Sequence, residues 1–391
     1  MSYSKRWAQA WLGLGFVWFL AGIALAPSNK LFQQGMILFL WLPTLLLAWS
    51  ARGLYAEGWR RQPLLWGSIL LLLGWGALSL LWSTSPEGAR DGKRLLYILV
   101  FLMAFPLLAQ AGLARIRQLL LVAGLLLGLG ALLSLVQFYA IMGHPWFERL
   151  YGIGEISHPI LGAYVIAAAL LWLLYSPPRQ AASTLAWALA LAFLGLFVIA
   201  TQSRGAALGL VLTVIAAPLW QRNRASCVLA VGALLASGLA FALVYQMITS
   251  RGASYRPEIF AAATEMISLH PLTGLGLGAP YDLQAQGLRF DHAHNMFTHI
   301  AIELGLPGML LWSGVWLAAL MHILRARHTA FGKMVLGLWL FATFAMQFDA
   351  ASLTDTPRAE WFISWLPVAM ALLLPWTTAE NDGCGKISRS T

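Results

Sequence analysis

The chain alternates between long apolar runs and short polar connections over most of its length. About twenty apolar residues are what one helix needs to cross the hydrocarbon core of a bilayer. Backbone polar groups in such a run must be satisfied within it, which favours helices over open strands. About twelve runs of this kind predict an all-α integral membrane protein: Trp7–Ala26, Leu31–Ser50, Leu64–Trp82, Leu95–Ala111, Leu119–Met142, Ile160–Tyr175, Leu185–Thr201, Ala206–Trp220, Cys227–Met247, Leu306–Ile323, Met334–Phe348 and Trp361–Trp376.

One segment, Asp291–Gly308, interrupts this pattern with closely spaced polar side chains. Three of the eight histidines, His292, His294 and His299, fall within it. Ionisable groups between membrane-spanning runs are costly, so they indicate chemistry or ion handling.

We expect a helix over Ala293–Leu304 in this segment. Gly305 is expected to end it, and Pro307 to break the chain before the next apolar run. The helix would carry two polar stripes, one of Asn295, His299 and Glu303 and the other of Asp291, His294 and Thr298.

The longest hydrophilic stretch, Thr249–Gly305, is expected on the outer side of the membrane. Within it, Pro257–Leu269 predicts a short helix lying along the membrane surface. Arg251 and Arg256 precede that helix, where its positive end adds to their attraction for an anion. The glycines of Gly274–Gly278 predict a turn with exposed backbone N–H groups, suited to a phosphate nest.

A second polar connection, Thr201–Gly205, is so short that Arg204 must lie at or just inside the outer interface. Two interpretations remain open. Arg204 extends to the lipid head groups as an anchor, or its planar fork binds a phosphate bidentately.

The distribution of charge predicts the orientation. The chain is 60% hydrophobic and 10% charged, with a mean hydropathy of +0.72, unlike a soluble domain. With both termini in the cytoplasm, the inner segments hold 15 of the 25 basic residues and three acidic ones, against 10 basic and 12 acidic residues outside. An inner excess of Lys and Arg is the usual rule for membrane proteins. It accounts for the net charge of +10 without a nucleic-acid partner.

These patterns predict a single multi-pass membrane domain over residues 1–376, with a long outer loop at 248–305 and a cytoplasmic tail at 377–391. The first apolar run is longer than the ~7–15 residues of a signal peptide, so we expect a retained span. Cys227 and Cys384 form no disulfide framework.

Three kinds of chemistry fit the polar residues. A zinc site would use His292 and His294 with His270 or His299, but the spacing matches no strong motif, and we expect no metal. A transporter would place charges at mid-span, whereas these lie in an outer loop. Outer arginines with a histidine instead predict a phosphate-binding membrane enzyme, in which arginines stabilise a leaving diphosphate and histidine takes a proton.

The segment His292-Ala-His294-Asn295, continuing to Glu303-Leu-Gly305-Leu-Pro-Gly308, resembles the signature of the O-antigen ligase and polymerase family of bacterial envelopes. The connection Thr201-Gln-Ser-Arg204-Gly205 also resembles that family, as does Arg256 followed by Pro271 and Gly274–Gly278. The likeness extends over nearly the whole chain.

The resemblance implies a metal-independent inverting glycosyltransferase of the inner membrane, with a GT-C-type fold and a periplasmic active site. The donor would be a glycan on undecaprenyl diphosphate, and the acceptor a sugar of lipid A–core oligosaccharide. Arg204 and Arg256 would bind the diphosphate, and His294 would deprotonate or position the acceptor. His292, Asn295 and Glu303 would support them, and Arg251 is added from its proximity.

Within the family, a ligase is preferred, because only a short tail follows the last apolar run, whereas protein-directed oligosaccharyltransferases tend to have longer C-terminal portions. A polymerase is the second interpretation. A polysaccharide or ion transporter is the alternative from another class.

Overall fold

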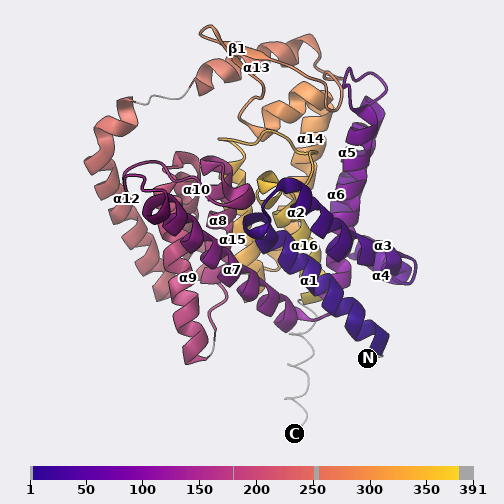
Figure 1. The fold of residues 1–391 in the computed structure, drawn as a ribbon. Coiled ribbons are helices and arrows are strands. Elements are labelled where there is room, and N and C mark those ends of the chain that lie inside the picture. The colour runs from indigo at the N-terminus through magenta and orange to yellow at the C-terminus, as the bar shows by residue number, and fades with distance from the viewer. Residues whose placement is uncertain (1–2, 179, 251–254, 378–391) are drawn as a thin grey trace.

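The computed structural model describes residues 3–178, 180–250 and 255–377, and these form an almost entirely helical molecule. Figure 1 shows the helices packed together as a bundle, some upright and some oblique in this view, with the segment around α13 and β1 at one end. The predicted all-α membrane class is confirmed. Arg251 lies outside the described residues, and nothing in the structure tests it.

The N-terminal part of the chain contributes ten helices or helical turns before α8. Their bounds are α1 Tyr3–Leu25, α2 Asn29–Met36, η1 Ile37–Trp41, α3 Leu42–Ala48, α4 Arg52–Arg61, α5 Pro63–Ser79, α6 Gly88–Ala109, α7 Leu113–Leu135, η2 Val136–Ile141 and η3 Gly154–Ile156.

The remainder carries the other helices and a two-stranded antiparallel hairpin. Their bounds are α8 Pro159–Leu174, α9 Ala181–Ala200, α10 Arg204–Ala216, α11 Pro218–Gln221, α12 Arg224–Ser250, α13 Arg256–Leu269, β1 Leu283–Ala285, β2 Leu288–Phe290, α14 Met296–Arg325, α15 Ala330–Ala345, η4 Ala359–Phe362 and α16 Trp365–Thr377.

Each predicted apolar run corresponds to one helix, to part of one, or to two or three consecutive helical elements. Nine helical stretches among the described residues are long and apolar enough to cross a membrane. The pair α4–α5, bent by 106°, would make a tenth, and α8 and α15 are apolar but shorter. Prolines begin several of these helices, for example Pro63 in α5 and Pro159 in α8, because the first turn needs no proline N–H.

One continuous hydrophobic core joins most of these helices. It includes large side chains without exposed surface, such as Trp172, Trp312 and Trp365. A smaller cluster, around Ile259 and Ala263 of α13 and Leu283 of β1, packs together the segment between α12 and α14. This segment is therefore a folded cap, and not an extended loop.

The helix expected over Ala293–Leu304 begins later, at Met296, and the proposed stripe of Asp291, His294 and Thr298 is therefore wrong. Asn295 is the N-cap, with its side-chain oxygen accepting from the N–H groups of Phe297 and Thr298. The predicted break at Gly305 is present: α14 continues beyond it, but Gly305 itself has φ 68° and ψ −177°.

Candidate active site

Three of the predicted site residues, Arg204, Arg256 and His294, line the same pair of adjoining cavities. The first cavity, about 520 Å³, is also lined by Leu208 and Phe260, and we call it the Leu208 cavity. The second, about 530 Å³, we call the Tyr164 cavity; its further lining is Arg149, Ile160, Tyr164, Gln202, Ser203, Tyr255 and Phe290. Because Arg204, Arg256 and His294 border both cavities, they lie at the junction between them.

Both arginines are first residues of helices, Arg204 of α10 and Arg256 of α13. The residues near these starts turn sharply, with positive φ at Gln202 (50°) and Tyr255 (58°). The positive end of each helix adds to the charge of its guanidinium. The local fold thus concentrates positive potential where an anionic ligand would lie.

Arg256 is held by the chain segment that follows α15. Its Nε and Nη2 donate to the carbonyl oxygen of Phe348 at 3.1 and 2.8 Å, and its guanidinium lies 5.9 Å from the centre of the Phe348 ring. These contacts fix the guanidinium plane, and neither hydrogen bond uses Nη1.

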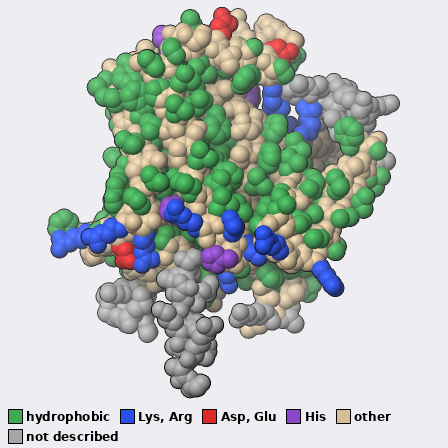
Figure 2. Space-filling model, turned by 180° about the vertical axis from the view of Figure 1, so that it is seen from behind, with side chains coloured by type: hydrophobic (Ala, Val, Ile, Leu, Met, Phe, Trp, Pro, Cys, Tyr) green, Lys and Arg blue, Asp and Glu red, His purple; other side chains and the backbone are tan. Residues whose placement is uncertain are grey.

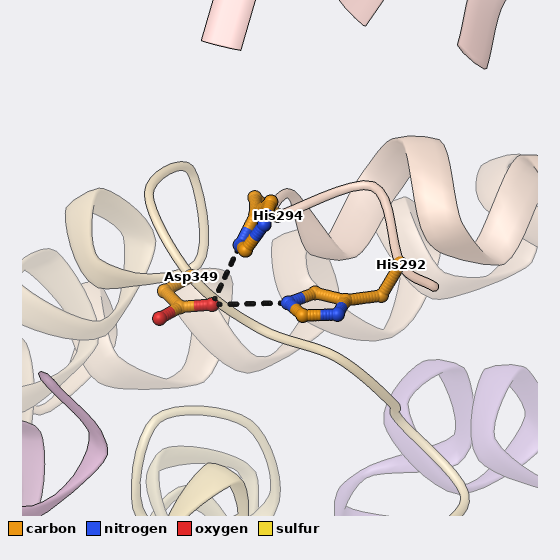
Figure 3. Close-up of side chains that lie close together, drawn as sticks. All are labelled: His292, His294 and Asp349. Carbon is orange, nitrogen blue, oxygen red and sulfur yellow. Dashed lines mark hydrogen bonds and ion pairs between the residues drawn. The ribbon is translucent and has the colours of Figure 1, made fainter. Parts of the chain in front are cut away.

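Asp349 brings the two site histidines together (Figure 3). His294 Nδ1 donates to Asp349 Oδ1 at 3.1 Å, and His292 Nε2 lies 3.5 Å from the same oxygen. The other ring nitrogen of His292 donates to Asp291 at 2.7 Å. His294 itself has φ 49°, a left-handed conformation that is uncommon for residues other than glycine and costs free energy.

The electrostatics follow from these contacts. Burial alone would raise the pKa of Asp349, but hydrogen bonds from His292 and His294 hold it well below its usual range. Burial alone would lower the pKa of His292, but Asp349 and Asp291 outweigh it and raise that pKa. Asp349 is thus an acceptor. It accepts a hydrogen bond from the Nδ1–H of His294, so that Nε2 is the ring nitrogen with a lone pair for accepting a proton.

Two buried tryptophans form hydrogen bonds to the backbone of the segment that follows Asp349. The indole N–H of Trp361 donates to Asp355 O at 3.0 Å, and that of Trp365 donates to Leu353 O at 2.8 Å. In the same segment, the Asp355 carboxylate forms ion pairs with Arg94 at 3.1 Å and with Arg358 at 2.8 Å. Asp349 therefore belongs to a segment with many fixed contacts, although it has no regular secondary structure.

Asn295 joins this segment to the start of α14. Its side-chain N–H donates to Gln347 Oε1 at 2.9 Å, and the N–H of Met296 donates to Met346 O at 2.9 Å. Asn295 also lines the Leu208 cavity. It thus fixes the position of His294 by anchoring both neighbouring segments.

Glu303 lies elsewhere and lines neither cavity. Its Oε1 accepts from the backbone N–H of Gly278 at 3.2 Å, and its Oε2 is 3.4 Å from His299 Nε2. His299 in turn bonds to Tyr281 through Nδ1 at 2.7 Å. This network fixes the Gly-rich turn against α14.

The expected phosphate nest at Gly274–Gly278 is not supported. The N–H groups of Leu275 and Gly276 donate to carbonyl oxygens of α14, and that of Leu277 donates to Ser79 Oγ at 3.1 Å. A Cβ at Gly274 would lie 2.4 Å from Glu303 O. The glycines thus allow close packing against α14, and their N–H groups already have partners.

The cluster of His292, His294 and Asp349 also has the composition of a metal site. One ligand atom from each lies within 4.8 Å of the others. Three protein ligands are what a catalytic zinc site provides. The hydrogen bonds described above account for the same geometry through protons alone, and a chelator distinguishes the two.

Asp349 is the site residue that the sequence pattern missed. It directly follows the predicted span Met334–Phe348, where one carboxylate looks like the start of an ordinary loop. Tyr164 was missed because it lies inside an apolar run. A carboxylate at the edge of such a run was the only signal for Asp349, and Tyr164 gave none.

The arrangement is suited to displacement of a diphosphate. Arg204 and Arg256 line both cavities, where they can bind a leaving diphosphate and stabilise its growing negative charge. A carboxylate-oriented imidazole beside them can accept a proton from an attacking hydroxyl. The adjoining cavities lie beside these groups and can admit the part of a substrate next to its diphosphate.

Comparisons with known proteins identify relatives of this chain. A family model described as "O-Antigen ligase" matches residues 187–313, a range that contains Arg204, Arg256 and His294. An O-antigen ligase of Pseudomonas aeruginosa is 32% identical over 313 residues, which is 76% of this chain and 74% of that protein.

Proposed function

The chain belongs to the O-antigen ligase family, and from this premise we propose that it transfers O-polysaccharide from undecaprenyl diphosphate to a sugar hydroxyl of lipid A–core oligosaccharide. The reaction would take place on the periplasmic side of the bacterial inner membrane. The observation that carries the proposal is the meeting of Arg204, Arg256 and His294 at the junction of the two cavities.

In this proposal the arginines hold the diphosphate. The planar guanidinium of Arg256, fixed by Phe348, presents Nη1 to a phosphate oxygen. Arg204, across the same cavities, supplies a second fork. Their charge would stabilise undecaprenyl diphosphate as it leaves.

His294 would be the base. Asp349 holds its Nδ1–H, so Nε2 accepts the proton of the acceptor hydroxyl. The acceptor oxygen forms a bond to the anomeric carbon, and the bond from that carbon to the diphosphate oxygen breaks. The electron pair leaves with the diphosphate, and the anomeric configuration inverts.

His292 would keep this pair in place. Both of its ring nitrogens face carboxylates, Asp291 and Asp349, which favours the protonated imidazolium. The cation would balance the charge of the Asp349 carboxylate that orients His294. Asn295 supports the same geometry through Gln347.

Reconstitution tests this function. Purified protein in liposomes would receive lipid-linked O-polysaccharide and lipid A–core, without nucleotide and with a chelator present. Transfer to lipid A–core is the expected result. Elongation of the lipid-linked glycan would identify a polymerase instead, and loss of transfer in chelator would assign a metal to the His292, His294 and Asp349 cluster.

A further inference from the structure

We propose that the Tyr164 cavity binds the first sugar of the donor, the one attached to the diphosphate, through the hydroxyl groups of Tyr164 and Ser203. This inference rests on the proposed function. It adds a saccharide subsite to a site otherwise defined by its phosphate and proton chemistry.

Two buried hydroxyls in this cavity have no partner among the described residues. The Tyr164 side chain, on α8, has no exposed surface, and Ser203, just before α10, is 2% exposed. Neither hydroxyl makes a hydrogen bond with the described part of the chain, and both residues line the same cavity. Buried polar groups are nearly always paired, so two orphans at one cavity indicate a ligand.

Folding does not account for either hydroxyl. Ser203 occupies the N-cap position of α10, where serine usually accepts from the first turn, yet its side chain makes no capping bond. The Tyr164 ring packs at 6.3 Å from the Phe341 ring, a contact that phenylalanine would make equally well.

Gly205 packs closely against the Tyr164 hydroxyl. A Cβ at this position would lie 2.8 Å from the Tyr164 hydroxyl and 3.0 Å from Phe348 Cβ. A residue with a Cβ would therefore displace the Tyr164 hydroxyl or Phe348 from its present position.

The contrast between the cavities indicates which part of the donor each accepts. The Leu208 cavity has apolar side chains from α10 and α13, and Leu208 and Phe260 are 45% and 54% exposed. With the diphosphate on the arginines at the junction, the polyprenyl chain fits the Leu208 side. The sugar at the other end then falls in the Tyr164 cavity, where hydroxyls can both donate to and accept from sugar hydroxyls.

Binding of two probes tests the assignment. One probe is undecaprenyl diphosphate, and the other is the same lipid diphosphate with one sugar attached. Tyr164→Phe and Ser203→Ala should each weaken the sugar-bearing probe roughly threefold to tenfold, the worth of one neutral hydrogen bond. Affinity for the bare diphosphate should stay unchanged.

Thermal unfolding of the same variants separates binding from packing. Removing a hydroxyl that has no protein partner should leave Tm equal or higher, whereas a structural hydroxyl would lower it. Thr213→Val is the matched control: this hydroxyl is also buried in α10 but donates to Gly209 O at 2.7 Å. It should leave the affinity for both probes unchanged.

Wild-type affinity for the sugar-bearing probe in both variants would overturn the inference. An equal loss of affinity for both probes would assign the hydroxyls to phosphate binding and overturn the inference too. A rise confined to the KM for lipid A–core in the transfer assay would assign them to the acceptor, with the same consequence. If wild-type protein transfers glycan on reconstitution while these variants bind normally, this inference fails alone. If wild-type protein transfers nothing, the proposed function itself fails.

Discussion

At the scale of single residues, Asp349 determines how His294 is presented. It is buried, accepts from His294, and lies close to His292. The backbone of His294 is strained, with φ 49°, and surrounding contacts must hold it there. A residue held in this way is expected to be sensitive to small changes in its neighbours.

The planar fork of Arg204 gives the first prediction. Arg204→Lys should behave nearly like Arg204→Ala, because an ammonium is a point charge and lacks two parallel N–H donors. Donor affinity should fall at least about tenfold, as expected for a charge-assisted hydrogen bond. Binding of undecaprenyl diphosphate measures it.

Arg289→Lys serves as the control for that substitution. Arg289 lies on β2, is exposed and pairs with Asp282, so its replacement should not affect binding. Wild-type affinity in Arg204→Lys would assign Arg204 to interfacial anchoring.

The raised pKa of His292 predicts how stability depends on pH. Burial alone would lower that pKa, but Asp349 and Asp291 raise it. A pKa that is higher in the folded state adds stability below the unfolded value, about 6.5, and this contribution is lost as pH rises through the folded value. The Tm of wild type minus that of His292→Gln should therefore be largest at acidic pH and shrink at alkaline pH. A difference that grows with pH would contradict the assigned charges.

Sequence reasoning identified Arg204, Arg256 and His294 as candidates because ionisable side chains stand out between apolar runs. Asp349 escaped because its partner His294 is 55 residues away, and only the fold brings them together. Tyr164 and Ser203 gave no signal, since hydroxyls are tolerated anywhere in a helix or turn.

At the scale of elements, the break in α14 at Gly305 allows the preceding loop to pack closely against this helix. Gly305 turns with φ 68°, and a Cβ there would lie 2.6 Å from Leu272 O. The N–H groups of Leu275 and Gly276 donate hydrogen bonds to carbonyl oxygens of α14 just before this break. The helix thus serves both as a membrane element and as the wall against which the Gly-rich turn packs.

Glu303 should contribute to stability rather than to donor binding. Glu303→Ala leaves the Gly278 N–H without its acceptor and should lower the unfolding free energy by about 1–3 kcal/mol. Affinity for undecaprenyl diphosphate should be unchanged, because Glu303 lines neither cavity. Unfolding and binding in detergent measure the two effects, with exposed Glu265→Ala on α13 as control. A loss of donor affinity without a loss of stability would refute this division.

Periodicity located the elements well. Pro257–Leu269 was predicted as a helix, and α13 spans Arg256–Leu269. The hairpin of β1 and β2 was not predicted, although its two-residue turn, Gln286-Gly287, has the positive φ angles typical of such turns. Three-residue strands are too short to show alternation. The start of α14 was placed too early, although Asn295 belongs to a residue type that favours the N-cap over the helix interior.

At the scale of the whole molecule, charge separates the two ends. Figure 2 shows Lys and Arg side chains gathered in a band near one end, with acidic side chains both within that band and at the opposite end. A further group of basic side chains lies in a hollow near the acidic end. The predicted orientation, with both termini in the cytoplasm, would place the basic band on the inner side of the membrane.

Thiol labelling tests that orientation. Cys227, at the start of α12, is exposed and predicted to face the cytoplasm. In a Cys384→Ser background, a membrane-impermeant reagent should modify it only after the cells are opened. Arg289→Cys, added to a cysteine-free variant, should react in intact spheroplasts. Modification of both positions from the same side would contradict the orientation.

The most direct test of the central claim separates donor binding from transfer. Undecaprenyl diphosphate binding and transfer to lipid A–core would be measured for wild type, Arg256→Ala and His294→Ala. Arg256→Ala should lose binding and transfer together, whereas His294→Ala should bind the diphosphate like wild type and transfer no glycan. Wild-type transfer by His294→Ala, or undiminished diphosphate binding by Arg256→Ala, would contradict the account.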